Sequence, residues 1–356
     1  MKTTSASLSK AAQRKIRKLW RIRRIGFVFS LFVRFVAIVL IFSVVLLHRL
    51  FLGPSESVSN MLTMTLLETS ALKFVPRIFI RESGVEAIQE TTRLVEPDAK
   101  VNTQLIQIGK YSSVSTATES EAVINEEPIE ILPVSGNTYK GYIMIVKDPS
   151  RVFLGVTSTH FAGRGMGIDE FCEKYNAVAG VNASGFEDEN GRGNGGTPIG
   201  MVISEGKILR KSDGKTTIAA FDENNILHVG KFTDEEAVSL KLRDGAGWGP
   251  ALIVNGVPAD IGSSSKTGLN PRTAIGQRAD GAVLLLVVDG RHPSSIGAGY
   301  ADLIEVLLKH GAVNACNLDG GTSSIMYYQG QRISSIENIS FSRSIPTAFL
   351  VKQEAQ

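Results

Sequence analysis

The sequence predicts an α+β fold: a mixed β-sheet domain with an embedded β-α-β unit, preceded by one transmembrane helix and a stalk. Three observations carry this prediction. An apolar run from Phe27 to Leu47 has the length of a membrane span. Short segments with the residue types of strands fill the first half of the body, between residues 140 and 230. In the second half, two apolar segments, 282–288 and 312–318, flank a segment with a helical apolar pattern.

The composition is that of a folded protein with a large core. Of the 356 residues, 43% are hydrophobic and 21% are charged, which excludes a disordered or low-complexity chain. The net charge of +3 conceals an asymmetry, because the first 55 residues hold 11 of the 38 basic residues and no acidic one. The remainder has 27 basic against 35 acidic residues, and this acidic balance argues against nucleic acid as a partner.

Cysteine and histidine are too few and too scattered to predict a zinc site. The five histidines contain no HExxH pair, and the two cysteines, Cys172 and Cys316, cannot form a zinc cluster. Both cysteines fit the pattern of small buried hydrophobic residues, with a disulfide between them as the open alternative. We therefore expect no metal ligands and no required cofactor, and we leave dependence on a divalent cation open.

The run from Phe27 to Leu47 is predicted to be a signal anchor. Two serines and Arg34 interrupt it, and its 21 residues cover about 30 Å as a helix, the thickness of a hydrocarbon core. Nine Lys or Arg residues lie between Lys2 and Arg24. The positive-inside rule then places residues 1–26 in the cytoplasm and the body outside, as in a single-pass type II protein of the cell membrane. A cleaved signal peptide is disfavoured because no A-x-A site follows, and a buried core helix because the flanks are basic.

Residues 48–136 are predicted to form a juxtamembrane segment and a stalk. Residues 61–74 have an amphipathic pattern that favours a short helix, which Pro76 would end. Residues 83–136 are rich in Thr, Ser and Glu and contain an acidic run without a sustained period. The globular body, the expected catalytic domain, then spans residues 137–352.

The first half of the body is predicted to consist mostly of short strands. Residues 142–147 and 152–157 flank an Asp-Pro-Ser turn and have the pattern of a hairpin. Residues 168–175 fit a short helix, and residues 177–181 fit a buried strand. Four further strands between residues 200 and 230 are expected to form a meander.

The second half predicts the β-α-β unit. Segment 282–288 (AVLLLVV) is wholly apolar, residues 301–309 form an amphipathic helix, and residues 312–318 form the next strand. A crossover of this kind makes its two strands parallel. The residues that follow the strands, Asp289 and Asp319, are therefore expected at one edge of the sheet, where such sheets place ligands.

Asp289 and Asp319 are the candidate catalytic pair. Neighbouring parallel strands lie ~5 Å apart, which would put the two carboxylates within the ~5–10 Å that glycosidases use. The alternative is ordinary turn chemistry, because a glycine follows each aspartate. Two Asp-Gly pairs at matched strand ends, one followed by Arg-His and the other by Gly-Thr-Ser, favour a functional site.

Two further segments supply polar side chains. Arg272 follows Asn-Pro at the start of a predicted strand, and a guanidinium there suits a bidentate grip on phosphate or carboxylate. Asn182 ends the buried strand and precedes small residues. Taken alone, Arg272 fits an ion pair and Asn182 a turn. The loop at 187–196 is interpreted as a glycine-rich turn, with a substrate-covering loop as the alternative, and it lacks the ligand spacing of an EF-hand.

In this order, these segments resemble the phosphodiester glycosidase family. The resemblance lies in NPRTAIG at 270–276, VDGR at 288–291 and NLDGGTSS at 317–324, with a helix and GAVNA between the last two. It covers about residues 140–352 and none of the anchor or stalk. At residues 182–186 this chain has Asn-Ala-Ser-Gly-Phe where the family often has Asn-Gly-Gly-Phe.

The resemblance implies hydrolysis at an anomeric carbon, with a phosphate ester as the leaving group. Asp319 is implied as acid/base or nucleophile and Asp289 as its partner, while Arg272 and Arg291 hold the phosphodiester. The other implied substrate-binding residues are Asn182, Asn317, Gly320, Gly321, Thr322, Ser323 and His292. The expected substrate is a sugar-1-phosphodiester, of the N-acetylglucosamine-1-phosphate type, in a cell-surface glycopolymer such as cell wall or exopolysaccharide.

Two other classes of function stay open. The main alternative is a non-catalytic module that binds or assembles wall or capsule polysaccharide, although a passive binder has less need of converging carboxylates and guanidinium groups. A metal-assisted phosphodiesterase that cuts the P–O bond is a weaker alternative, because the chain has few histidines and no dense carboxylate cluster.

Overall fold

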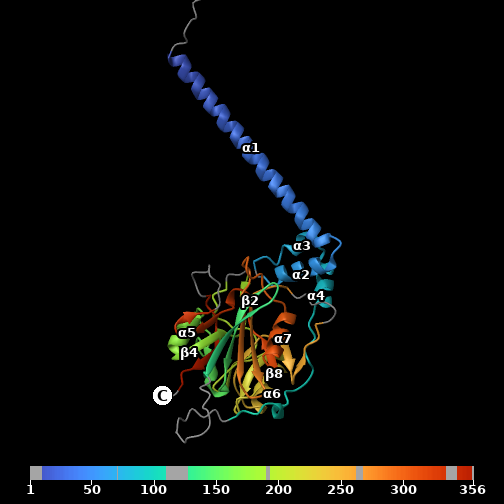
Figure 1. The fold of residues 1–356 in the computed structure, drawn as a ribbon, viewed down its shortest axis with the longest axis vertical. Coiled ribbons are helices and arrows are strands. Elements are labelled where there is room, and N and C mark those ends of the chain that lie inside the picture. Colours follow the sequence, from blue (N-terminus) through green and yellow to red (C-terminus); the bar gives the residue numbers. More distant parts are fainter. Residues whose placement is uncertain are drawn as a thin grey trace, which may run out of the picture. The chain divides into compact units, whose positions relative to one another are not determined.

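The computed structural model describes residues 10–69, 71–109, 127–189, 193–261, 268–333 and 343–354. The chain divides into two compact units, Met1–Ser59 and Asn60–Gln356. Figure 1 shows a single long helix in the first unit, and strands with short helices in the second. The combination of helices with several antiparallel sheets confirms the predicted α+β class. Most of the acidic run of the predicted stalk lies outside the described residues.

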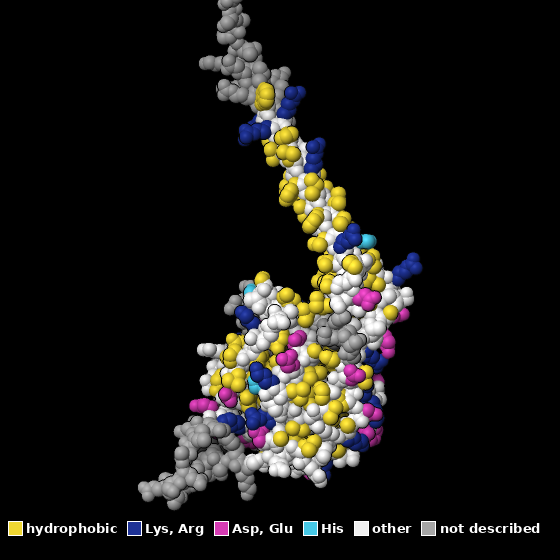
Figure 2. Space-filling model, turned by 45° about the vertical axis from the view of Figure 1, so that its right-hand side comes forward, with side chains coloured by type: hydrophobic (Ala, Val, Ile, Leu, Met, Phe, Trp, Pro, Cys, Tyr) yellow, Lys and Arg dark blue, Asp and Glu magenta, His cyan; other side chains and the backbone are white. Residues whose placement is uncertain are grey.

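The first unit is dominated by helix α1 (Lys10–Leu52). Within its segment Arg23–Leu52, the most apolar window of 18 residues has a mean hydropathy of 2.7 and no buried residues. By length and composition this segment can cross a membrane, and it contains the predicted span from Phe27 to Leu47. Figure 2 shows hydrophobic side chains around the helix, with Lys and Arg near its N-terminal end.

Much of the region between the apolar run and the body is structured, where the sequence pattern predicts a short helix at residues 61–74 followed by a stalk. Its elements are α2 (Glu56–Leu67), α3 (Pro76–Phe79), α4 (Glu82–Thr91) and the 3-10 turn η1 (Thr103–Leu105). Pro76 begins α3 instead of ending a helix, because its missing N–H has no partner to lose in the first helical turn. Val85 and Ile106 are buried, and Leu94 and Val101 pack against the hydrophobic clusters of the body, so this part of the chain belongs to the second unit.

The largest sheet has seven strands in the order β1-β2-β13-β12-β14-β10-β11, and every neighbouring pair is antiparallel. The first strand lies before residue 137 and pairs with β2 along its whole length. The bounds are β1 (Ile129–Ser135), β2 (Lys140–Val146), β10 (Ala251–Val254), β11 (Val257–Pro258), β12 (Arg272–Arg278), β13 (Val283–Val288) and β14 (Ala312–Asn317).

The predicted β-α-β unit consists of β13, helix α7 (Tyr300–Lys309) and β14, but its strands are not neighbours. Strand β12 lies between them and is antiparallel to both, so β13 and β14 run parallel at about 10 Å, two strand spacings apart. The prediction of adjacent strands is therefore wrong. Strand β12, which precedes both strands in the chain, lies between them. The local sequence pattern does not indicate this pairing, because it joins segments that are distant in the sequence.

Two five-stranded sheets complete the body, in the orders β16-β15-β4-β17-β3 and β6-β5-β9-β7-β8. The predicted hairpin of β2 with β3 is wrong, because the two strands lie in different sheets. The predicted meander is also wrong in part, because β9 separates the hairpins β5–β6 and β7–β8.

The strand bounds in these two sheets are β3 (Val152–Val156), β4 (Ala177–Asn182), β5 (Val202–Ser204), β6 (Lys207–Arg210), β7 (Thr216–Asp222), β8 (Leu227–Phe232), β9 (Leu242–Gly247), β15 (Met326–Tyr328), β16 (Gln331–Arg332) and β17 (Thr347–Lys352). The remaining helical segments are η2 (Pro149–Arg151), α5 (Ile168–Lys174), α6 (Asp234–Ser239) and η4 (Gly321–Ser323). The predicted helix at 168–175 and strand at 177–181 correspond to α5 and β4.

Strand β13 is wholly apolar because both of its faces are buried. Val283 and Leu285 pack in the cluster shared with the two smaller sheets, whereas Leu284 and Leu286 pack in the cluster that contains the apolar side of α7. The large sheet therefore lies between α7 and the rest of the body. This packing fixes the sheet edge at which β13 and β14 end and β12 begins.

Candidate active site

A cavity of about 510 Å³ opens at this edge of the large sheet. It collects residues from the ends of β13 and β14, the start of β12, the loop after β4 and the segment after α2. Its lining residues are Glu68, Thr69, Ala71, Phe186, Asp188, Ile199, Trp248, Asn270, Arg272, Arg291, Tyr300, Asp319, Gly320, Gly321, Thr322, Ser323 and Arg343. Seven of the eleven predicted site residues are among them, which places most of the predicted site in one cavity.

Asp319 lies just after the end of β14 and lines the cavity. Its backbone N–H donates to the carbonyl of Ala183 at 3.0 Å, which ties it to the loop after β4. Burial raises the pKa of the Asp319 carboxyl from 3.8 to about 6, against the opposing effects of the Ser323 hydroxyl and the positive charge of Arg343. A carboxyl with a pKa in this range can both accept and give up a proton near neutral pH.

The Gly320–Gly321 pair lets the chain turn tightly beside Asp319. A Cβ on Gly320 would lie 2.9 Å from the Pro271 carbonyl oxygen, and Gly321 has a φ of +63°. A Cβ on Gly321 would also lie 3.2 Å from Nη2 of Arg291. The glycines are therefore needed for close approach between this turn and the arginine segments, and this explains the Asp-Gly-Gly pattern.

Arg272 is the first residue of β12, opposite Val288 at the end of β13, and is only 6% exposed. Its guanidinium lies 4.4 Å from the Tyr300 ring centre and donates to the carbonyls of Ala298 and Gly268. Its Nη2 also lies 2.6 Å from the Glu68 carboxylate. Burial lowers the pKa of Arg272, but Tyr300 and Glu68 outweigh this effect and raise it.

Arg291 and Arg343 add two more guanidinium groups to the same cavity. Nη2 of Arg291 donates to the Asn270 side chain at 3.2 Å and to the Thr69 hydroxyl at 3.3 Å. Burial and the positive charges of Arg272 and Arg343 lower the pKa of Arg291. Guanidinium groups bind phosphate or carboxylate oxygens well, and in this cavity Arg272 and Arg343 are already paired with the carboxylates of Glu68 and Asp188.

Glu68 supplies a carboxylate from the segment after α2. Besides Arg272, it accepts a hydrogen bond from the Asn270 amide at 2.8 Å. Its neighbour Thr69 accepts from Arg291. The side chains of this short segment therefore bind Arg272 and Arg291, the two arginines that the family resemblance assigns to the phosphodiester.

The structure does not bring the other four predicted residues into the cavity lining. The Asp289 side chain is 3% exposed, and its backbone bonds to Lys140 and Ser295 within the sheet edge. His292 bonds to Ser294 within its own turn. Asp289 is set apart because its strand is two positions from β14, so the spacing expected for neighbouring strands does not apply.

Asn182 and Asn317 are buried framework residues. The Asn182 amide donates to the backbone carbonyl of Asp319 at 2.6 Å, and its oxygen accepts from the Thr273 hydroxyl and the Ile325 N–H. Asn317 donates to the Gly249 carbonyl at 2.8 Å. Asn182 thus fixes the backbone that carries Asp319, a role different from the predicted contact with sugar.

Six lining residues with polar or aromatic side chains were not among the candidates predicted from the sequence: Glu68, Thr69, Asp188, Trp248, Tyr300 and Arg343. They come from the expected juxtamembrane segment, the glycine-rich loop and separate loops or helix ends. No short motif joins them. Of these residues, only Asp188 lies in a segment that the sequence connects with the site, because the glycine-rich loop at 187–196 has a substrate-covering loop as its alternative interpretation.

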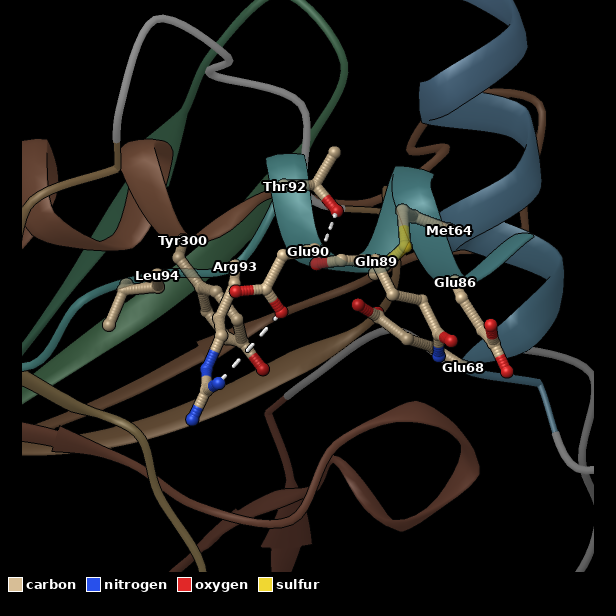
Figure 3. Close-up of a pocket in the computed structure, with 9 residues that line it drawn as sticks. All are labelled: Met64, Glu68, Glu86, Gln89, Glu90, Thr92, Arg93, Leu94 and Tyr300. Carbon is tan, nitrogen blue, oxygen red and sulfur yellow. Dashed lines mark hydrogen bonds and ion pairs between the residues drawn. The ribbon is translucent and has the colours of Figure 1, made fainter. Parts of the chain in front are cut away.

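Figure 3 shows the residues that line a second cavity of about 500 Å³. Glu68 and Tyr300 line both cavities, and the second is completed by side chains around α4. Figure 3 shows Glu86, Gln89 and Glu90 on this helix around the same space. Among the described residues, no group of three or more His, Cys, Asp or Glu side chains is arranged to hold a metal ion.

The fold and cavity together define an α+β protein whose site combines the Asp319 carboxyl group, with its raised pKa, with a cluster of three arginines. Residues 175–352, half of the chain, match the family of phosphodiester glycosidases. The chain therefore belongs to the phosphodiester glycosidase family, as its motifs suggested. The match covers most of the described cavity, including Arg272, Arg291 and Asp319.

Individual relatives are similar to part of the chain. The chain is 28% identical over 201 residues to the SPbeta prophage-derived uncharacterized protein YomE of Bacillus subtilis, covering 54% of this chain and 29% of the relative. It is 28% identical over 153 residues to N-acetylglucosamine-1-phosphodiester alpha-N-acetylglucosaminidase of Bos taurus, covering 38% of this chain and 29% of the relative. The chain thus spans less than a third of the length of either relative.

A solved structure supports the fold. The catalytic domain of the zebrafish N-acetylglucosamine-1-phosphodiester alpha-N-acetylglucosaminidase, auto-inhibited by its pro-peptide, aligns with a TM-score of 0.53. The alignment covers 65% of this chain and 85% of the zebrafish chain, at 19% sequence identity. At this identity the likeness concerns the arrangement of the elements alone.

Proposed function

We propose that this chain hydrolyses the glycosidic bond of a sugar-1-phosphodiester. The observation that carries the proposal is one cavity that holds the Asp319 carboxyl, with its pKa raised to about 6, beside the guanidinium groups of Arg272 and Arg291. A carboxyl able to change its charge near neutral pH suits attack at an anomeric carbon. Guanidinium groups suit the phosphodiester and the charge that grows on it as the bond breaks.

In the proposed reaction, Asp319 acts in its ionised form. It either removes a proton from the attacking water, or attacks the anomeric carbon itself to form a glycosyl ester that water then hydrolyses. Both roles need the carboxylate. Arg272 and Arg291 hold the two non-bridging phosphate oxygens and stabilise the phosphate monoester that leaves. Because such a phosphate is a good leaving group, the reaction has little need of a second carboxyl group as acid. This fits the position of Asp289 outside the cavity lining.

Substrate has to replace Glu68 at Arg272. The Glu68 carboxylate lies at the guanidinium that the proposal assigns to phosphate, 2.6 Å from Nη2. A phosphodiester carries the same charge and the same kind of acceptor oxygens, so exchange preserves the ion pair. The segment after α2 would therefore hold the chain in an inhibited state until an anion displaces it, in parallel with the zebrafish relative that is auto-inhibited by its pro-peptide.

We further propose that α1 anchors the chain in the cell membrane, with the body outside the cytoplasm. The apolar length of Arg23–Leu52 and the basic residues before it support this orientation. The substrate would then be a cell-surface glycopolymer. The name of the bovine relative points to N-acetylglucosamine as the sugar and a 1-phosphodiester as the linkage.

The test is turnover by the full chain in detergent micelles. The substrate is the methyl diester of N-acetylglucosamine-1-phosphate, and released sugar is measured. We expect turnover by the wild type and a fall in kcat of about 100-fold or more in Asp319→Asn. Asp280→Asn, at an exposed carboxylate paired with Arg278, is the matched control and should keep full activity. Binding of the diester by the folded wild type without release of sugar would instead support the polysaccharide-binding module.

A further inference from the structure

Two charged residues of the cavity have no role in the reaction as proposed above. Asp188 lies in the loop after β4, and Arg343 lies shortly before β17. Both line the cavity that holds Asp319. Arg343 Nη2 lies 2.5 Å from Oδ2 of Asp188, and their side chains are 24% and 14% exposed. This is a largely buried ion pair inside the site, between segments far apart in the chain.

Arg343 is held in place on three sides. Besides Asp188, its Nη1 donates to the Thr322 hydroxyl at 2.5 Å. Its guanidinium also lies 4.8 Å from the centre of the Phe186 ring. Thr322 belongs to the turn that follows Asp319, so Arg343 connects this turn to the loop that carries Asp188. A flexible surface arginine has no such set of contacts.

Asp188 is fixed in turn by the glycine-rich loop. Its Oδ1 accepts a hydrogen bond from the Gly193 N–H at 2.7 Å. A Cβ on Gly193 would lie 2.4 Å from the carbonyl oxygen of Glu187, so a larger residue cannot sit there. Gly195 has a φ of +69°, and its Cβ would lie 1.9 Å from the Ser344 carbonyl oxygen, next to Arg343. The glycines allow the two segments to meet, which explains why this loop is rich in glycine.

The pair acts on Asp319 with two opposite charges. Arg343 favours the ionised carboxylate and lowers the pKa of Asp319, whereas Asp188 disfavours it and raises that pKa. The Ser323 hydroxyl and the Gly320 N–H also favour the ionised form. The remaining charged or titratable side chains that line the cavity are Glu68, Arg272, Arg291 and Tyr300.

We propose that Asp188 and Arg343 are a positioning pair that sets the pH at which Asp319 becomes ionised and so becomes active. This inference rests on the proposed function, in which the ionised Asp319 does the chemistry. Asp188 and Thr322 together fix the position of the Arg343 guanidinium. The negative charge of Asp188 also offsets part of the positive charge of Arg343. Without Asp188, the whole charge of Arg343 would act on Asp319.

The two members of the pair therefore predict opposite effects. In Asp188→Asn a negative charge is lost and Arg343 is released, so the acid limb of the kcat profile should move down by about one pH unit. In Arg343→Gln the stabilising cation is lost, so the same limb should move up by about one unit. Side chains that only hold the loops together would reduce kcat at every pH without moving the limb.

The experiment measures kcat against pH for the full chain in detergent, with the methyl diester of N-acetylglucosamine-1-phosphate as substrate. Arg343→Lys keeps the charge and should leave the limb close to that of the wild type. Glu223→Gln removes a carboxylate from an exposed ion pair with Lys241, outside the cavity lining, and is the matched control. Circular dichroism checks that each variant is folded. If Arg343→Gln does not fold, Asp188→Asn decides the matter through the direction of its shift.

A direct titration separates this inference from the proposed function. Aspartate labelled with carbon-13 at the carboxyl carbon reports the ionisation of Asp319 by NMR, with the signal assigned by its loss in Asp319→Asn. We expect its midpoint to fall in Asp188→Asn and to rise in Arg343→Gln, whether or not the diester is turned over. An unmoved midpoint, or shifts in the same direction, would overturn the role of the pair even in an active enzyme. Absence of turnover with opposite shifts would overturn the proposed function alone.

Discussion

Replacing Asp319 with asparagine should stabilise the protein at alkaline pH, although it removes the carboxyl group that is proposed to act in catalysis. The pKa of the Asp319 carboxyl is raised from 3.8 to about 6 because burial disfavours its charge. The folded state therefore holds this proton more tightly than the unfolded state. The resulting stabilisation is complete below about pH 4 and is lost as the pH rises through 6. Asparagine has no charge to gain and avoids this loss.

The size of the effect follows from the shift. One pKa unit corresponds to about 1.4 kcal/mol, so a rise of about two units costs the wild type at most about 3 kcal/mol above pH 7. Solvent at the partly exposed Asp319 reduces this to about 1–3 kcal/mol. At about 2–4 °C per kcal/mol for a domain of this size, the melting temperature then changes by about 2–12 °C.

The assay is thermal unfolding of the full wild-type chain and of Asp319→Asn in detergent, followed by circular dichroism at pH 4.5, 6 and 8. The melting temperature of the variant, relative to the wild type, should increase across this range. Comparing pH values removes the constant effect of exchanging one side chain for the other. A difference that is the same at pH 4.5 and pH 8, or that falls with pH, would refute the raised pKa and the reasoning built on it.

Four further outcomes are expected. Arg272→Lys keeps the charge but loses the planar fork, so kcat/KM should fall by about 10- to 100-fold; an undiminished value would make Arg272 peripheral. Glu68→Gln should bind inorganic phosphate more tightly than the wild type in a thermal-shift titration, because the competing carboxylate is gone; equal affinity would contradict its place at the phosphate site. Both thiols are free and buried, and burial raises the pKa of Cys172 to about 12 and that of Cys316 well above 9, so neither should react with Ellman's reagent at pH 8 until the chain is unfolded. Protease added to intact cells should remove the body and spare the basic N-terminus; protection of the body would contradict the proposed orientation.

The elements of the fold could largely be predicted from local sequence patterns, but their arrangement could not. Strands β13 and β14 and helix α7 were recognisable because a doubly buried strand and an amphipathic helix have distinct periodicities. The order of the strands depends on pairing between distant segments. Strand β12, between β13 and β14, shows this, and it moves Asp289 away from Asp319.

The predictable part of the site is the part that lies in short motifs. Arg272, Arg291 and the run from Asp319 to Ser323 are adjacent to strand ends and carry recognisable spacing, and the structure places them in one cavity. Asp188, Arg343 and Glu68 come from loops and from the segment after α2, which have no periodic pattern. Their contribution depends on tertiary contacts, such as the ion pair between Arg343 and Asp188, that a local pattern does not encode.

The central claim, cleavage at the anomeric carbon in the Asp319 cavity, is tested most directly by isotope incorporation. The full chain is incubated with the methyl diester of N-acetylglucosamine-1-phosphate in water enriched in oxygen-18, and both products are analysed by mass spectrometry. Attack at the anomeric carbon puts the label in the released sugar and leaves methyl phosphate unlabelled, with Asp319→Asn giving neither product at a comparable rate. Label in the phosphate product would mean cleavage of the P–O bond and would contradict the glycosidase assignment.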